Sequence, residues 1–166
     1  ERGENALNIM DVIAYLASDN IPIDSLLEHL IQNDSQRYDA VSLLEQYSLI
    51  RLKNGLLHVH RLVQQVTRIN LQKENKHEET IYQTYETLMK SFPFDSDKKK
   101  DIEEKRQFLP LFEQFLQHFE SCSKTKSIDL HNLYMNMSDV YSNLGITKNK
   151  VSVLEKDLAI FEKHYG

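Results

Sequence analysis

The stretch SLIRLKNGLLHVH, residues 48–60, decides the fold of the first half of this 166-residue chain. Two apolar runs flank Asn54-Gly55, which is a strong hairpin signal because a type I′ turn needs positive φ at both central residues. A two-residue closure predicts two cross-strand pairs: Leu52 with Leu57, and Ile50 with Val59. We expect these four side chains to face the core. The opposite face would then carry Leu49, Arg51, His58 and His60.

Helical periodicity lies on both sides of this hairpin. We expect a mostly buried helix over Ala6–Ala17, and a second helix that opens at Ile21-Pro22, since proline fits the first helical turn. A third helix, over about residues 34–47, carries Tyr38, Val41, Leu43, Leu44 and Tyr47. After His60, apolar residues return at helical spacing: Leu62, Val63, Val66 and Ile69. Three helices, a hairpin and a following helix are the plan of a winged helix.

The rest of the chain also has helical patterns, separated by polar stretches. A boundary is expected within Gln72–Thr80, a loop at 92–97 and a polar linker at 121–127. Between these breaks we expect a helix around 81–89 and a second one with a buried Phe stripe over 108–119. Pro110 must either kink that second helix or begin its second part. Two last helices, about 129–144 and 148–164, meet at Leu144-Gly145, where glycine suits a left-handed C-cap. The predicted parts are residues 1–75, 76–127 and 128–166.

Composition excludes several classes of protein. Glycines stand only at positions 3, 55, 145 and 166, so the chain cannot supply a phosphate-binding GxxxxGK[ST] or GxGxxG loop. No apolar run approaches the roughly 18 residues that span a bilayer, so we expect no membrane partner. The single cysteine rules out a disulfide framework, and with the acidic balance (net charge −5) it predicts a cytoplasmic protein.

No residue pattern here indicates catalysis, so we expect a protein that is not an enzyme. His58 and His60 share a strand face, but no third ligand falls at a matching spacing, so no metal site is predicted. Cys122 lies in the polar linker, and we expect it to be a thiol without a catalytic role.

The last two helices resemble a tetratricopeptide repeat of the kinesin-light-chain type. The large, apolar, small, aromatic and Leu-Gly positions of its first helix are matched by Tyr134, Met137, Ser138, Tyr141 and Leu144-Gly145. The second helix reads VSVLEKDLAIFEKHYG. It departs at Lys150 and Asp157, where that repeat prefers alanine, and this implies a terminal or atypical repeat.

The first half resembles the winged-helix region of NB-ARC (STAND-type) signalling NTPases. The resemblance rests on YLASDNIPIDSLL, LLEQYSLI and HVHRLVQQVTR, and the later run FLPLFEQFLQHF resembles the helix between winged helix and repeats in relatives with tetratricopeptide tails. It implies a mainly α protein: a winged helix of three helices plus a β-hairpin, a helical bridge, and a tetratricopeptide-like pair.

The same resemblance implies a role for His60. In that family a Met-His-Asp triplet ends the winged-helix hairpin, and its histidine touches the phosphate of bound ADP. The matching residues here are Val59, His60 and Arg61, so the histidine is kept and the aspartate is replaced. ADP or ATP is expected only with a separate nucleotide-binding domain of the same chain, and the helical half is expected to bind a protein or peptide.

Two other functions remain open. A winged helix can be a DNA-binding regulator, but the third helix holds Asp34, Asp39 and Glu45 against Arg37 alone. Phosphate contacts need positive charge, so nucleic acid is not the expected partner. The chain could also be a free-standing adaptor whose helical repeats bind a peptide.

Overall fold

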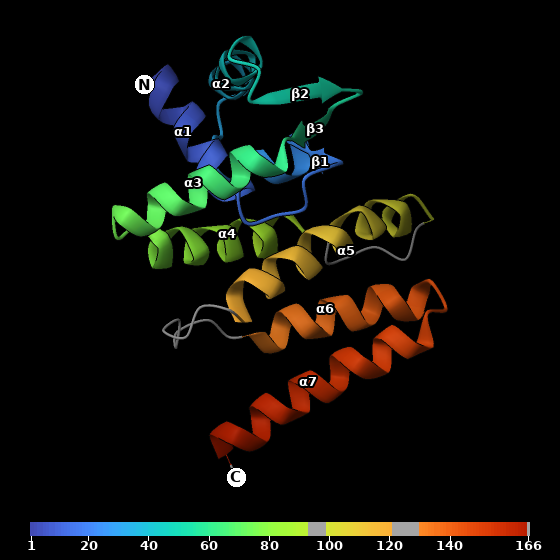
Figure 1. The fold of residues 1–166 in the computed structure, drawn as a ribbon. Coiled ribbons are helices and arrows are strands. Elements are labelled where there is room, and N and C mark those ends of the chain that lie inside the picture. The colour runs from blue at the N-terminus through green and yellow to red at the C-terminus, as the bar shows by residue number, and fades with distance from the viewer. Residues whose placement is uncertain (93–98, 121–129, 166) are drawn as a thin grey trace.

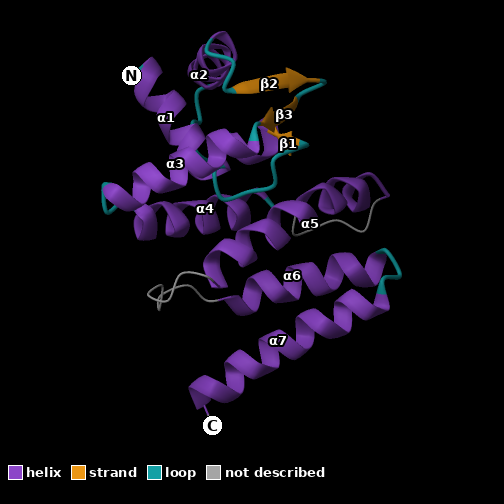
Figure 2. Ribbon diagram, in the orientation of Figure 1, coloured by secondary structure: helices purple, strands orange, loops and turns teal. Residues whose placement is uncertain are grey.

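The structure is a computed structural model that describes residues 1–92, 99–120 and 130–165, which form a mainly helical fold with a small antiparallel sheet (Figure 1). The mainly α prediction is confirmed. Helices outweigh strands throughout (Figure 2). The elements are α1 (Arg2–Ile13), β1 (Ile21–Pro22), η1 (Ile23–Leu27), α2 (Asp34–Gln46), β2 (Ile50–Lys53), β3 (Leu56–Val59), α3 (Arg61–Lys73), α4 (His77–Ser91), α5 (Lys99–Glu120), α6 (Leu130–Asn143) and α7 (Thr147–Tyr165).

The predicted hairpin is confirmed in position and register. Leu52 pairs with Leu57 and Ile50 with Val59, and Asn54 and Gly55 have φ of 52° and 73°, as a type I′ turn requires. Of the four side chains predicted to face the core, Leu57, Val59 and Ile50 are buried. Leu52 is half-buried. On the opposite face, Leu49 differs from its prediction, because it is half-buried and packs against the core.

The predicted second helix is wrong at its start. Ile21 and Pro22 form β1, an edge strand in the order β1-β3-β2, with Ile21 opposite Leu57. Proline lacks an N–H, so an edge strand tolerates it. Only the π-helical turn η1 follows, and it buries Ile23, Leu26 and Leu27. Backbone pairing with β3 therefore replaces the first helical turn, while the apolar residues that follow still pack into the core.

The other helices of the first half differ from prediction at their ends and faces. Helix α1 begins at Arg2 and ends at Ile13, although the residues up to Leu16 remain buried. Helix α2 is capped by Asn33, whose side chain accepts a hydrogen bond from the Gln36 N–H at 3.1 Å. Two aromatic residues of its expected apolar stripe lie outside the core, Tyr38 at 44% and Tyr47 at 72% exposure.

Helices α3 and α4 join through a tight turn within the expected boundary, at Glu74, Asn75 and Lys76. Helix α4 contacts both α1 and η1, and the Ser91 hydroxyl donates to the Leu26 carbonyl at 3.3 Å. One hydrophobic core therefore runs from α1 to α7. The division after residues 75 and 127 stays a prediction.

Helix α5 runs through Pro110 as one element, and Pro110 itself is exposed. The predicted Phe stripe is confirmed as core, since Phe108, Phe112 and Phe115 are fully buried. Most of the predicted loop at 92–97 and the linker at 121–127, with Cys122, lie outside the described residues. Among the described residues, no helix combines the length and apolar character that a membrane crossing requires.

Helices α6 and α7 pack side by side at the end of the molecule opposite to α1 and α2 (Figure 1). Gly145 between them has a φ of 70°, which confirms the predicted left-handed C-cap. The two polar departures from the repeat pattern bridge the pair. Lys150 Nζ donates to Ser142 Oγ at 3.1 Å, and Asp157 lies 2.9 Å from His131 Nδ1.

Candidate functional site

His60 lies at the junction between β3 and α3, with its side chain exposed. It is the N-cap of α3, and its Nδ1 accepts a hydrogen bond from the Leu62 N–H at 3.2 Å. Because Nδ1 is an acceptor, the proton of the neutral ring sits on Nε2. His60 thus has the outward position that the sequence predicts, together with a capping role that the sequence did not reveal.

The neighbouring His58 has a different role. Its Nδ1 lies 3.1 Å from Asp19 Oδ1, and the Val59 N–H donates to the Ser18 carbonyl at 2.8 Å. Hydrogen bonds from His58 and Ser18 lower the pKa of Asp19, with the Ser18 bond the larger cause. These contacts hold the loop after α1 against β3. His58 therefore contacts Asp19, whereas His60 caps α3.

Helix α3 turns much of its apolar stripe away from the core. Leu62, Val66 and Ile69 are 60%, 49% and 41% exposed, while the polar Gln64 is buried. The Gln64 amide donates to the carbonyl of Ile13, the last residue of α1, at 2.8 Å and to the carbonyl of Leu16 in the turn that follows at 3.0 Å. These bonds satisfy carbonyl groups at the helix end and fix the rotation of α3 about its axis.

The outward stripe borders an apolar groove between α1 and α3 of about 450 Å³. Leu7 of α1, which is 65% exposed, faces the same groove. Contiguous exposed aliphatic residues on two adjacent helices are typical of an interaction surface. We call this surface the α1–α3 groove, and its apolar lining residues are Leu7, Met10, Leu49, Leu62, Val63, Val66 and Leu71.

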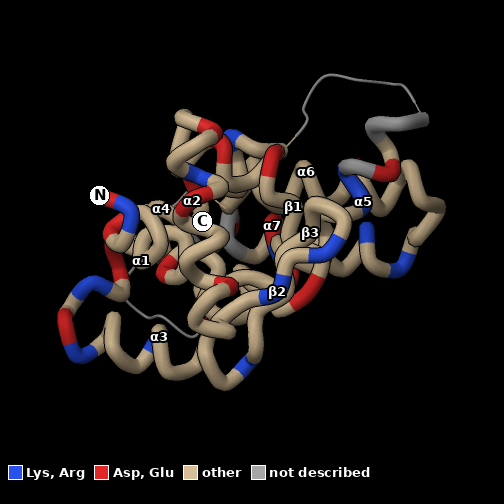
Figure 3. Tube along the Cα trace, turned by 90° about the horizontal axis from the view of Figure 1, so that it is seen from above, with Lys and Arg blue, Asp and Glu red and all other residues tan. Residues whose placement is uncertain are grey.

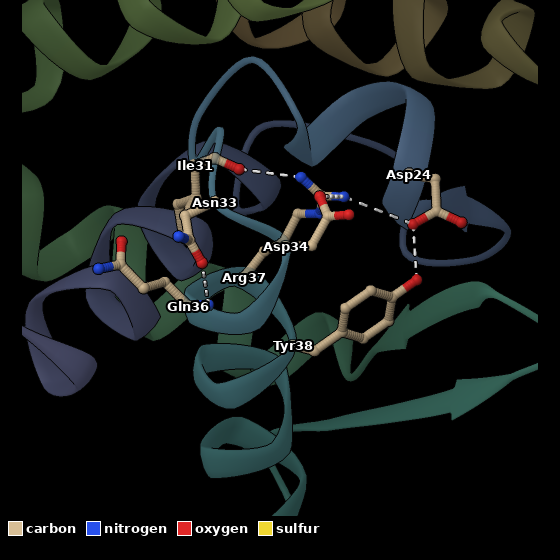
Figure 4. Close-up of polar contacts among 7 residues, drawn as sticks. All are labelled: Asp24, Ile31, Asn33, Asp34, Gln36, Arg37 and Tyr38. Carbon is tan, nitrogen blue, oxygen red and sulfur yellow. Dashed lines mark hydrogen bonds and ion pairs between the residues drawn. The ribbon is translucent and has the colours of Figure 1, made fainter.

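A buried arginine joins η1 to α2 (Figure 4). Arg37 is 4% exposed; one terminal nitrogen donates to the Ile31 carbonyl at 2.9 Å and the other to the Asp34 carboxylate at 2.8 Å. The Asp24 carboxylate lies 3.8 Å from Arg37 and accepts a hydrogen bond from the Tyr38 hydroxyl at 2.6 Å. The Arg37 Nε atom has no hydrogen-bond partner among the described residues.

This burial bears on the DNA-binding hypothesis. Arg37 is the one cation of α2, and its charge is used inside the fold, while Asp34, Asp39 and Glu45 remain exposed. Figure 3 shows basic and acidic residues interspersed along the described trace. The face that α2 offers to solvent is thus acidic, and an acidic face repels the DNA backbone.

The helical half has a groove of its own, about 320 Å³, between α5, α6 and α7. The Tyr141 hydroxyl donates to the Glu113 carboxylate, and Lys156 pairs with Glu120 at 3.0 Å. Burial is the main cause that raises the pKa of both Tyr134 and Tyr141 to about 12, so both hydroxyls stay protonated. The groove therefore offers aromatic and amide surface with both acidic and basic side chains at its edge.

Comparisons of the chain with known protein families, with curated proteins and with solved structures find no match. The resemblance to NB-ARC proteins and to tetratricopeptide repeats thus rests on the sequence motifs alone.

Sequence reasoning found His60 but missed Gln64, Arg37 and the α1–α3 groove. Gln64 lies between Val63 and Val66, and apolar periodicity gives no weight to a polar residue in such a place. Arg37 is a charged residue on a helix, a kind of residue that is usually exposed, yet the fold buries it. A possible signal was its position three residues after Asp34, the spacing of a helical ion pair.

Proposed function

We propose that this chain is a non-catalytic regulatory and protein-interaction segment of a cytoplasmic, nucleotide-switched signalling protein. Its α1–α3 part, as a winged helix, closes on a nucleotide-binding body of the same protein, and α6 and α7, as a tetratricopeptide-like pair, bind a protein partner. The observation that carries the proposal is the outward apolar stripe of α3, which begins at Leu62, two residues after His60.

The α3 stripe and His60 favour the same docking partner. A body that covers Leu62 and Val66 also lies over the N-terminus of α3, where His60 Nε2 is the donor. A histidine at that place can donate to a phosphate oxygen, and the helix dipole favours the same anion. Covering the aliphatic residues supplies affinity, and His60 makes the contact depend on the bound nucleotide.

The test is nucleotide retention by the full-length gene product. We expect a phosphate-binding loop upstream of Glu1 and ADP in the purified protein. Replacing Leu62 and Val66 by serine should speed ADP release, because the closed state loses its apolar contact. A matched control carries serine at Val151 and Leu158, which are also exposed but lie on α7. Equal release rates for the two double variants, or a purified protein without nucleotide, would refute the proposal.

The adaptor hypothesis predicts a different result from the same experiment. A free-standing peptide-binding adaptor has no nucleotide-binding body, so its coding sequence would contain no phosphate-binding loop. No specific observation favours the DNA-binding regulator, since α2 has an acidic outer face and its arginine is buried.

A further inference from the structure

We propose that a polar cleft between α3, α5 and the loop after α1 binds the phosphate group of a small phosphorylated molecule. The cleft has a volume of about 400 Å³, which lies in the range of small-molecule sites. Polar residues of α3 form one wall of the cleft, residues of α5 form the other wall, and the loop 16–20 closes one side. The wall residues of α3 are Arg61, Gln64 and Arg68, and those of α5 are Pro110, Gln114 and His118.

Helical spacing explains why these side chains meet. The α3 residues stand at i, i+3 and i+7 and the α5 residues at i, i+4 and i+8, so each set lies on one helix face. Arg61 and Arg68 are about 10 Å apart along the axis of α3. Arginine side chains are long enough for two guanidinium groups at this separation to reach one phosphate between them.

The two arginines form no close ion pair in the described part of the chain, although the charge of Arg61 is the smallest of the causes that lower the pKa of Asp19. Neither forms an ion pair there, and the Arg68 guanidinium donates to the carbonyl of Ala14. The carboxylate that lines the cleft, Asp19, already accepts hydrogen bonds from Ser18 at 2.7 Å and from His58 at 3.1 Å. Two guanidinium groups thus stand against this one carboxylate, and the described lining has an excess of positive charge.

Neutral groups complete the lining. The Gln114 amide lies 3.2 Å from His118 Nε2. Burial is the largest cause that lowers the pKa of His118 to about 4, and the positive charge of Arg68 adds to it, so His118 is uncharged at neutral pH. The attraction for an anion thus comes from the two guanidinium groups, and Gln114 and His118 add no charge to the lining. Leu16, Ala17 and Pro110 give apolar surface for a carbon skeleton.

A phosphate dianion fits this set best. Its two charges match two guanidinium groups, whose planar donors bind phosphate oxygens in pairs. A monocarboxylate would leave one arginine unmatched. The proposal does not depend on the nucleotide-switch function, because every residue that it uses lies in this chain.

The first experiment titrates the 166-residue chain with inorganic phosphate and with glycerol phosphate at constant ionic strength, followed by calorimetry or amide chemical shifts. We expect saturable binding of both anions, and weaker binding of acetate. Arg61→Gln should weaken phosphate binding about tenfold or more, because a charge-assisted contact is lost. Arg51→Gln, an exposed arginine on β2, is the matched control and should leave binding unchanged.

A second set of variants tests the cleft from the other wall. Gln114→Glu should abolish binding by placing a carboxylate among the phosphate ligands, whereas Gln117→Glu, on the exposed face of α5, should not. Asp19→Asn should tighten binding, since it removes the negative charge. Absence of saturable binding, equal losses in Arg61→Gln and Arg51→Gln, or equal effects of the two glutamate variants would overturn the proposal.

Discussion

Helices α6 and α3 both have an amphipathic sequence, but they place their apolar stripes oppositely. Helix α6 buries Leu133, Tyr134, Met137 and Val140 against its neighbours, as helical periodicity predicts. Helix α3 buries Gln64 and leaves Leu62 and Val66 largely in solvent. The difference indicates that α6 has its packing partners within the described chain, whereas the described residues leave much of the apolar stripe of α3 uncovered.

The comparison also shows how the fold can hold α3 in this orientation. The buried amide of Gln64 holds the end of α1 through two hydrogen bonds, so rotating α3 to bury its aliphatic residues would break both. A buried donor without its partner costs about 1–3 kcal/mol. These hydrogen bonds, together with buried Leu71, thus hold the Gln64 face of α3 inward.

The largest expected effect compares two Leu→Ala substitutions. Leu57→Ala should lower the free energy of unfolding by about 2–4 kcal/mol, because Leu57 is fully buried at the centre of the sheet. Leu62→Ala removes the same atoms from a side chain that is 60% exposed and should change stability little. Urea unfolding of both variants measures the difference. Equal losses would mean that the α3 stripe is not a free surface.

Gln64→Leu tests the hydrogen-bonded side of α3. The change keeps the side-chain size but removes both donors to Ile13 and Leu16, so we expect a loss of about 1–3 kcal/mol in urea unfolding. Gln65→Leu alters an exposed neighbour in the same way and serves as the control. A Gln64→Leu protein as stable as the wild type would contradict the assignment of this amide as the contact that orients α3.

A smaller effect is expected from pH. His118 packs edge-on against Tyr15 near His77 and Arg68, and its pKa falls from 6.5 to about 4 on folding; burial lowers the pKa of His77 as well. The unfolded chain then binds more protons between these values, so stability should be full above about pH 6.5 and fall as the pH drops toward 4. Thermal melting from pH 7.5 to 4.5 measures the loss.

His118→Gln should reduce this acid sensitivity, because glutamine does not titrate. His29→Gln, at an exposed position after η1, is the control and should melt with the wild-type pH dependence. Identical pH profiles for His118→Gln and the wild type would remove His118 as the source of the effect.

The local sequence signals predicted the hairpin, the Phe stripe of α5 and the turn at Gly145, since turn chemistry and apolar spacing fix these features within a few residues. The start of the second helix could not be predicted. Ile21 and Pro22 fit the first turn of a helix, and only pairing with distant Leu57 makes them a strand. Tertiary contact thus overrides local propensity there.

The candidate site was predicted only in part. The outward position of His60 followed from extending the hairpin register by one residue beyond Val59, the last residue of β3. Its contact with the Leu62 N–H and the burial of Arg37 and Gln64 depend on how helices dock, which no local pattern encodes. The polar cleft combines residues from α3 and α5 that lie more than forty positions apart in the sequence.

The most direct test of the account is the ADP content of the full-length gene product with His60 changed. His60→Ser keeps a capping oxygen for α3 but cannot reach a phosphate, so it separates the two roles of this residue. We expect ADP release about 10- to 100-fold faster than in the wild type, since one charge-assisted hydrogen bond is lost. His29→Ser should retain ADP. Equal ADP occupancy and equal release rates in wild type and His60→Ser would contradict the account.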